Sequence, residues 1–169
     1  MYFCSMENQE NIPGTPPPDC FRLEEIEAFQ AAEGQVLSDV NYYLWLNTAE
    51  PGEAPYRFLF YLELVFEDSS SLLVTSGDDS EAIRVSTAEA LIETAARLRT
   101  LHNKVSIQRV NAGSLPIWQP AAGRTLEAVR LSRNDRQLYQ NDAFLLDFGA
   151  HGVLVHLAEK EGLAVSRWQ

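Results

Sequence analysis

A twelve-residue segment occurs twice in this chain. Residues 29–40 are FQAAEGQVLSDV and residues 118–129 are WQPAAGRTLEAV, so five of twelve positions are identical and both segments open with an aromatic residue. A repeat at a fixed offset predicts one supersecondary unit used twice. The identical pairs are Gln30/Gln119, Ala32/Ala121, Gly34/Gly123, Leu37/Leu126 and Val40/Val129.

Three further segment pairs continue the repeat in the same order. Residues 62–66 align with 144–148, 72–74 with 153–155, and 81–85 with 161–165. The offset falls from 89 to 82, 81 and 80, which places a seven-residue shortening between the first and second strands of the unit. The ordered recurrence favours a duplication. The alternative is that amphipathic strands resemble one another by composition.

Proline, glycine and capping residues divide the chain. Residues 1–19 are rich in proline and predict a flexible leader. A helix is predicted after it, with Asp19 as N-cap and Gly34 past its end. A second helix is predicted from the capping box at residues 86–89 to about Leu101.

Most of the remaining chain has the pattern of strands. Leu62, Leu64 and Phe66 alternate with acidic residues, which is typical of a strand with one buried and one wet face. Turn residues follow at 68–71 and 149–152, as expected for hairpins. The three-residue steps from Leu37 to Val40 and from Leu126 to Val129 break strict alternation and predict a bulge or a turn at the entry of the unit's first strand.

These signals predict a β-rich α+β fold. We expect two tandem related four-stranded antiparallel β units, packed as a sandwich or a distorted barrel, with one well-capped connecting helix and an N-terminal helix. The expected organisation is a leader over 1–19, a first β unit with flanking helices over 20–101, and a second β unit over 102–169. The two units are expected to form one compact domain.

Aromatic residues are dense between residues 42 and 61. Tyr43 and Trp45 are predicted on one strand face, and Tyr42 and Leu44 on the other. Since both faces are apolar, something must cover each of them. We expect one cover to be the protein's own second sheet or helix, while the other is the N-terminal helix, a self-association surface or a partner.

Charge is distributed unevenly. Residues 1–100 carry 18 acidic against 5 basic side chains, a balance of −13, and residues 101–169 carry 6 against 8, a balance of +2; together they give the net −11. Nucleic acid is therefore disfavoured as a partner, because it requires a clustered basic surface. An acidic surface favours a basic protein partner, although solubility alone also explains it. The candidate partner-binding residues are Glu50, Glu53, Glu67, Asp68, Asp78, Asp79 and Glu81.

The sequence contains no convincing catalytic, metal or nucleotide motif. His102, His151 and His156 are too scattered for a ligand set. Ser114 lacks the second glycine of a nucleophile elbow, and the acids of residues 78–81 lack the spacing of a calcium loop. We therefore expect no cofactor and no metal ion, and enzymatic activity is not favoured.

Three classes of function stay open. The first is a non-enzymatic acidic interaction module, such as an inhibitor, an immunity-type protein or an adaptor, that binds a basic protein. The second is a small-ligand-binding or substrate-processing domain with a site between the duplicated halves. The third is a self-assembling structural subunit, and homo-oligomerisation is left open. No apolar run is long enough to span a membrane and no secretory signal is recognised, so a cytoplasmic location is expected.

Overall fold

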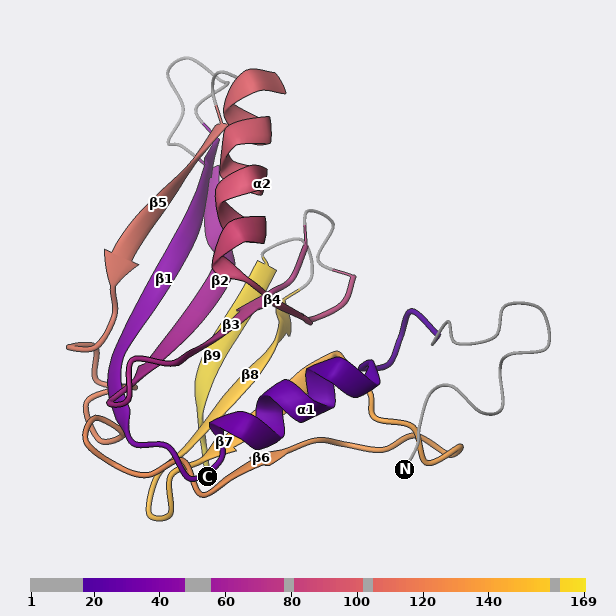
Figure 1. Ribbon diagram of the computed structural model, residues 1–169, viewed down its shortest axis with the longest axis vertical. Helices are drawn as coiled ribbons and strands as arrows, with labels where there is room; N and C mark the ends of the chain where they lie inside the picture. Colours follow the sequence, from indigo (N-terminus) through magenta and orange to yellow (C-terminus); the bar gives the residue numbers. More distant parts are fainter. Residues whose placement is uncertain (1–16, 48–55, 78–80, 102–104, 159–161) are drawn as a thin grey trace.

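The computed structural model describes residues 17–47, 56–77, 81–101, 105–158 and 162–169 (Figure 1). These residues are β-rich, with two helices and a curled antiparallel sheet in the form of a half-barrel. The elements in chain order are α1 (Leu23–Ala32), β1 (Leu37–Asn47), β2 (Tyr56–Phe66), β3 (Ser71–Thr75), β4 (Arg84–Ser86), α2 (Ala88–Leu101), β5 (Val105–Asn111), β6 (Ala128–Arg130), β7 (Ala143–Asp147), β8 (Gly152–Ala158) and β9 (Gly162–Trp168).

The helix α1 begins later than the sequence predicts. Asp19 lies in a turn, and the residue before the first helical turn is Arg22, whose main-chain N–H donates to Glu25 Oε1 at 2.8 Å. The prediction of Asp19 as N-cap is wrong, because a glutamate inside the first turn reaches back and binds the free amide of the cap position instead. Gly34 follows the helix with φ of +89°, so the predicted glycine past its end is confirmed.

The helix α2 is confirmed, with its cap displaced by one residue. The Thr87 hydroxyl oxygen accepts the N–H of Ala90 at 3.1 Å, so Thr87 occupies the cap position that the sequence assigned to Ser86. Ser86 ends β4 instead, where its main chain pairs with β3. Neither helix among the described residues is long and apolar enough to cross a membrane.

The strands form one continuous sheet rather than two packed sheets. Its order is β4-β3-β2-β9-β8-β7-β6, and β1 pairs with both β2 and β5. The two four-stranded meanders, β1–β4 and β6–β9, are joined where Leu59 of β2 pairs with Leu163 of β9. Of the two expected arrangements the sandwich is wrong, and the distorted barrel is nearer to the structure, because the single sheet curls into a half-barrel.

The main core lies inside the curl of the sheet. α1 packs against β3, β4 and β6, and its buried Phe29 contacts Phe21 and Phe144 with ring centroids 5.1 Å apart in both pairs. Trp118 is fully buried in the same core and donates from Nε1 to the Tyr42 hydroxyl at 2.7 Å. Phe66, which the sequence places on a buried strand face, and Phe148, the residue aligned with it, are both buried here.

A second core lies between α2 and the outer face of β1, β2 and β5 (Figure 1). The Trp45 ring stacks on Phe58 at 5.2 Å, and Leu91 and Leu98 of α2 are buried in the same cluster. The expected internal cover of one aromatic face is thus α2. On the opposite face, Tyr42 packs against the main core, while Leu44 is only partly buried.

Two bulges adjust the register between β1 and β2. The first lies between Leu37 and Asp39, so the bulge predicted at the strand entry is confirmed. The second leaves Phe60 unpaired opposite the step from Tyr43 to Leu44. This second bulge turns Phe60 and the next residue, Tyr61, toward the same core, which the sequence did not predict.

Candidate functional site

The structure describes three of the seven predicted partner-binding acids, and it places them at two sites. Glu67 and Asp68 are exposed in the turn between β2 and β3, and Glu81 is exposed before β4. The five residues of β3 span about 16 Å and separate these two positions. Glu50, Glu53, Asp78 and Asp79 lie outside the described residues.

A second acidic segment lies close to Glu67. Val36 accepts the N–H of Glu67 at 2.9 Å and forms an isolated bridge with Thr125. Two residues after Thr125, Glu127 is exposed and donates its N–H to the carbonyl of Asp147 at 2.8 Å. The segment around Val36 therefore lies between the end of β2, which carries Glu67, and the residues before β6, which include Glu127. We call the surface formed by Glu67, Asp68, Glu127 and Asp147 the acidic end.

Paired main-chain hydrogen bonds build this end. Gly34 donates to the carbonyl of Leu126 at 2.7 Å, and Gly123 donates to the carbonyl of Leu37 at 2.8 Å. Both glycines have positive φ, +89° and +78°, which an L side chain rarely adopts. Each glycine turn is thus hydrogen-bonded to a residue that follows the other glycine, and these bonds fix the position of the segment that contains Glu127.

Local hydrogen bonds keep two of these acids ionised. The side-chain and main-chain donors of Ser70 hold the pKa of Asp68 below its usual value. The Gly149 N–H lowers the pKa of Asp147 most, and Arg130 adds to the effect through a 2.8 Å ion pair. Arg130 neutralises Asp147, and the exposed Arg124, whose carbonyl accepts the Leu37 N–H at 2.9 Å, adds one positive charge. The net negative charge of this end therefore comes from the exposed Glu67, Asp68 and Glu127.

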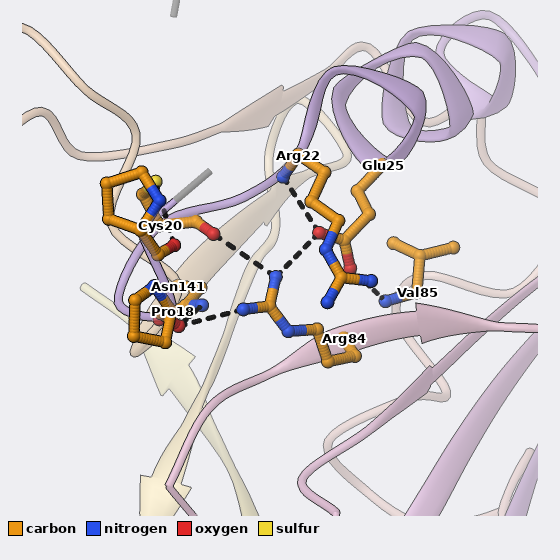
Figure 2. Close-up of polar contacts among 8 residues, drawn as sticks. Pro18, Cys20, Arg22, Glu25, Arg84, Val85 and Asn141 are labelled. Carbon is orange, nitrogen blue, oxygen red and sulfur yellow. Dashed lines mark hydrogen bonds and ion pairs between the residues drawn. The ribbon is translucent and has the colours of Figure 1, made fainter. Parts of the chain in front are cut away.

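The acid Glu81 lines the same hollow as Pro18 and Arg84. These two residues belong to a buried polar network that joins α1 to β4 (Figure 2). Glu25, only 3% exposed, binds Arg84 through Oε1 at 2.8 Å and accepts the Val85 N–H through Oε2 at 2.8 Å. Arg84 also donates to the carbonyl of Pro18 at 2.8 Å. Because each of these groups is already engaged within the protein, the network is a structural clamp rather than a binding site.

Polar groups around two further hollows are also engaged. A hollow of about 440 Å³ lies where β1, β5 and the following turn meet. Both carboxylate oxygens of Asp39 accept hydrogen bonds, from the Val40 N–H at 2.8 Å and from Asn111 Nδ2 at 2.7 Å. A second hollow, of about 580 Å³, lies between α1 and the segment from Ala128 to Tyr139. Among the residues described, no group of three acidic, histidine or cysteine side chains is placed to hold a metal ion.

The described histidines and core tyrosines show no catalytic arrangement. His151 is buried, and its Nε2 donates to the carbonyl of Ile117 at 2.8 Å. Burial is the main cause that raises the pKa of both Tyr42 and Tyr43, so both hydroxyls stay protonated at neutral pH. His102 lies outside the described residues.

Sequence reasoning missed Glu127 and Asp147. Charge was summed along the chain, and these acids belong to a half with a balance of +2. The repeat could have indicated them. It matches Gly34 with Gly123, so the residues that follow each glycine are expected at equivalent positions of the two units.

No protein-family model matches the chain, and comparisons with curated proteins and with solved structures found no match either.

Proposed function

We propose that this protein is a non-enzymatic interaction module that binds a basic protein partner through its acidic end. The observation that carries the proposal is that main-chain hydrogen bonds place Glu67 and Glu127, which are far apart in the sequence, in the segments on either side of Val36. Exposed carboxylates grouped in this way attract a basic surface over long range.

The state of the other polar groups supports a binding role without catalysis. Glu25, Asp39 and Asp147 use their oxygens within the fold, and Tyr42 and Tyr43 are protonated at neutral pH. Glu67 and Glu127 form no ion pair with another described residue. They are therefore available to a partner.

Affinity capture from native lysate tests the proposal. The wild-type protein, Glu67→Lys/Glu127→Lys and a control, Glu27→Lys/Glu93→Lys, are immobilised, and bound proteins are identified by mass spectrometry. The control makes the same change in net charge on exposed helix positions away from the acidic end. We expect a basic protein that the wild type and the control retain at low salt, that high salt releases, and that the acidic-end variant does not bind.

Two results would contradict the proposal. One is equal retention of the same protein by all three baits. The other is a retained partner that is itself acidic. Reversing Glu81 in a separate variant then determines whether the acids near β4 contribute, as the sequence analysis expected.

We also infer that the two meanders are copies of one duplicated unit. Their registers support this, because residues matched in the sequence pair with matched residues. Val40 pairs with Leu64 in the first meander, and Val129 with Leu146 in the second. The matched outer pairs are Val74 with Val85 and Val155 with Val165.

The test is an experimental structure in which the two meanders are superposed. We expect Gly34 to fall on Gly123 and Phe66 on Phe148 over the four strands. A superposition that needs a different alignment would contradict the duplication.

A further inference from the structure

The edge strands of the sheet differ in whether their outward main-chain N–H groups are bound by side chains. At one end of the strand order, the Val85 N–H of β4 is bound by Glu25, and at the other end the Val129 N–H of β6 is bound by Glu33 at 2.8 Å. Both carboxylates come from α1 or its C-cap. The third edge is β5, which pairs only with β1 among the described strands.

The pairing of β5 with β1 shows which of its main-chain groups face outward. The Ala112 N–H donates to the carbonyl of Val40 at 2.8 Å, in line with the register in which Asn111 faces Asn41. Since hydrogen-bonded pairs alternate along an antiparallel ladder, the even-numbered residues of β5 bond to β1. The odd-numbered residues therefore direct their N–H and C=O groups away from the sheet: Val105, Ile107, Arg109 and Asn111.

This outer edge is exposed. Five of the seven residues of β5 are exposed, and only Val105 is buried. Figure 1 shows β5 at the margin of the molecule, with no other described strand on its outer side. An exposed edge with free main-chain groups is a template for another strand.

We propose that β5 pairs with β5 of a second copy of this chain, antiparallel about a two-fold axis at Gln108. In this register Ile107 faces Arg109 of the second copy, and Val105 faces Asn111. Every outward N–H and C=O of β5 then meets an outward group of the other strand, which no shifted register achieves over the same length.

The side chains of β5 suit a second copy. Arg109 is the only charged residue of the strand, and the two-fold register places it opposite an isoleucine rather than opposite its own equivalent. Gln108 is exposed and lies opposite itself, where two amide groups can bond to each other. The strand carries no acidic residue of its own, so its side chains do not bring like negative charges together in the pairing.

This inference does not depend on the proposed function, and salt separates the two. Two molecules of net charge −11 repel each other, so added salt strengthens the dimer. Added salt weakens the binding of a basic partner. A single strand pair buries less area than a standard interface, so we expect a weak, concentration-dependent dimer.

Sedimentation equilibrium of the full chain over a concentration series tests the dimer. Arg109→Pro removes an outward N–H without removing a bond to β1, and a proline is tolerated at a free edge. Arg109→Ala is the matched control, because it loses the same side chain and keeps the N–H. We expect dimers of the wild type and of Arg109→Ala, and a monomer of Arg109→Pro with an unchanged unfolding transition.

A charge exchange at Gln108 tests the register without touching the main chain. Gln108→Glu and Gln108→Lys each place like charges opposite each other at the axis, so each variant alone should dimerise about threefold to fivefold more weakly than the wild type. An equimolar mixture should recover or exceed the wild-type association. This test also holds if Arg109→Pro does not fold.

Three results would overturn the inference. The first is a wild type that stays monomeric at every concentration and salt level. The second is a dimer that responds equally to Arg109→Pro and Arg109→Ala. The third is a mixture of the Gln108 variants that associates no better than either alone.

Discussion

The sheet leaves a gap between its end strands β4 and β6, which α1 covers and which we call the seam. The seam and the outer edge of β5 both present unpaired main-chain groups, and described residues satisfy these groups at the seam only. At the seam, the edge strands β4 and β6 each have an N–H bound by a carboxylate, from Glu25 and Glu33. At β5 the alternate N–H groups face outward, and no described residue binds them. An unpaired edge invites another strand unless something blocks it.

The difference shows how one helix substitutes for missing strands. The half-barrel would need further strands to connect β4 with β6, and α1 packs against both instead. Its buried face fills the gap with Phe29, and its acids satisfy the edge amides. α2 covers a face of the sheet near β5 and does not bind its edge. The seam is therefore part of the core, and the β5 edge is a surface.

The largest effect is expected from Phe29→Ala. Phe29 is 2% exposed and packs between Phe21 and Phe144, so its truncation should lower the free energy of unfolding by about 3–5 kcal/mol. Denaturant unfolding followed by circular dichroism measures the change. Ile92→Ala, at a position that is 68% exposed on α2, should change it by less than about 0.5 kcal/mol. A similar change in the free energy of unfolding for both variants would contradict the assignment of Phe29 to the core that closes the seam.

Glu25→Ala should cost about 3 kcal/mol. The variant leaves the partly buried Arg84 without its carboxylate and removes the acceptor of the Val85 N–H. Glu24→Ala is the neighbouring control, because Glu24 is exposed and should change stability by about 0.5 kcal/mol or less. A loss below about 1 kcal/mol for Glu25→Ala would mean that this end of the seam does not depend on the clamp.

Glu33→Ala should cost about 1 kcal/mol or less. Its carboxylate accepts one main-chain N–H, from Val129, and it is partly exposed, so water can replace it. Hydrogen exchange of the Val129 amide should accelerate in the variant even where the total stability changes little. Unchanged exchange at Val129 would show that another group protects this edge.

Lowering the pH should slightly reduce the free energy of unfolding through Asp147 of β7, which forms an ion pair with Arg130 of β6. The pKa of Asp147 is lowered in the folded state by Gly149 and Arg130, so the unfolded state takes up a proton at higher pH than the folded state. This contribution is complete above the unfolded pKa of about 3.9 and is lost as the pH falls through the folded pKa. Denaturant unfolding against pH should therefore show a shallower acid limb for Asp147→Asn. An identical limb would contradict the linkage.

Amide exchange of the wild type compares the two edges without a mutation. At low protein concentration, Val85 and Val129 should exchange slowly, because each N–H is bound to a carboxylate. Ile107 and Arg109 should exchange quickly, because their N–H groups face outward from the β1–β5 ladder. Protection of Ile107 and Arg109 that appears only at high concentration would support pairing of β5 with a second molecule. Slow exchange at low concentration would show that this edge is already covered.

Local signals in the sequence were enough for the hairpins and the helices. The alternation around Leu62 and Leu64 and the turn residues that follow correspond to β2, the next turn and β3. The bulge at the entry of β1 was predicted from spacing, because a bulge changes which residues share a face. The start of α1 was missed because its amide is bound by a glutamate inside the helix, and the sequence alone does not select between Asp19 and Glu25 for this role.

The candidate site needed information that summed charge does not contain. Glu67 and Asp68 were predicted as exposed acids and are exposed. Glu127 was not predicted, because its position relative to Glu67 depends on main-chain hydrogen bonds that both segments make to residues 35–37. Likewise, the bulge at Phe60 places two successive residues in the cluster that contains Leu91 and Leu98 of α2, which no local pattern of strand residues specifies.

The sequence by itself determined which segments become strands and helices, where turns occur and which segments resemble one another. These properties follow from the period of apolar residues and from the main-chain preferences of glycine, proline and capping residues, which act over a few residues. Only the tertiary structure decided that the two meanders join into one curled sheet through Leu59 and Leu163. It also decided that α1 closes the seam and that β5 pairs only with β1 among the described strands, because strand pairing and burial depend on contacts between segments far apart in the chain.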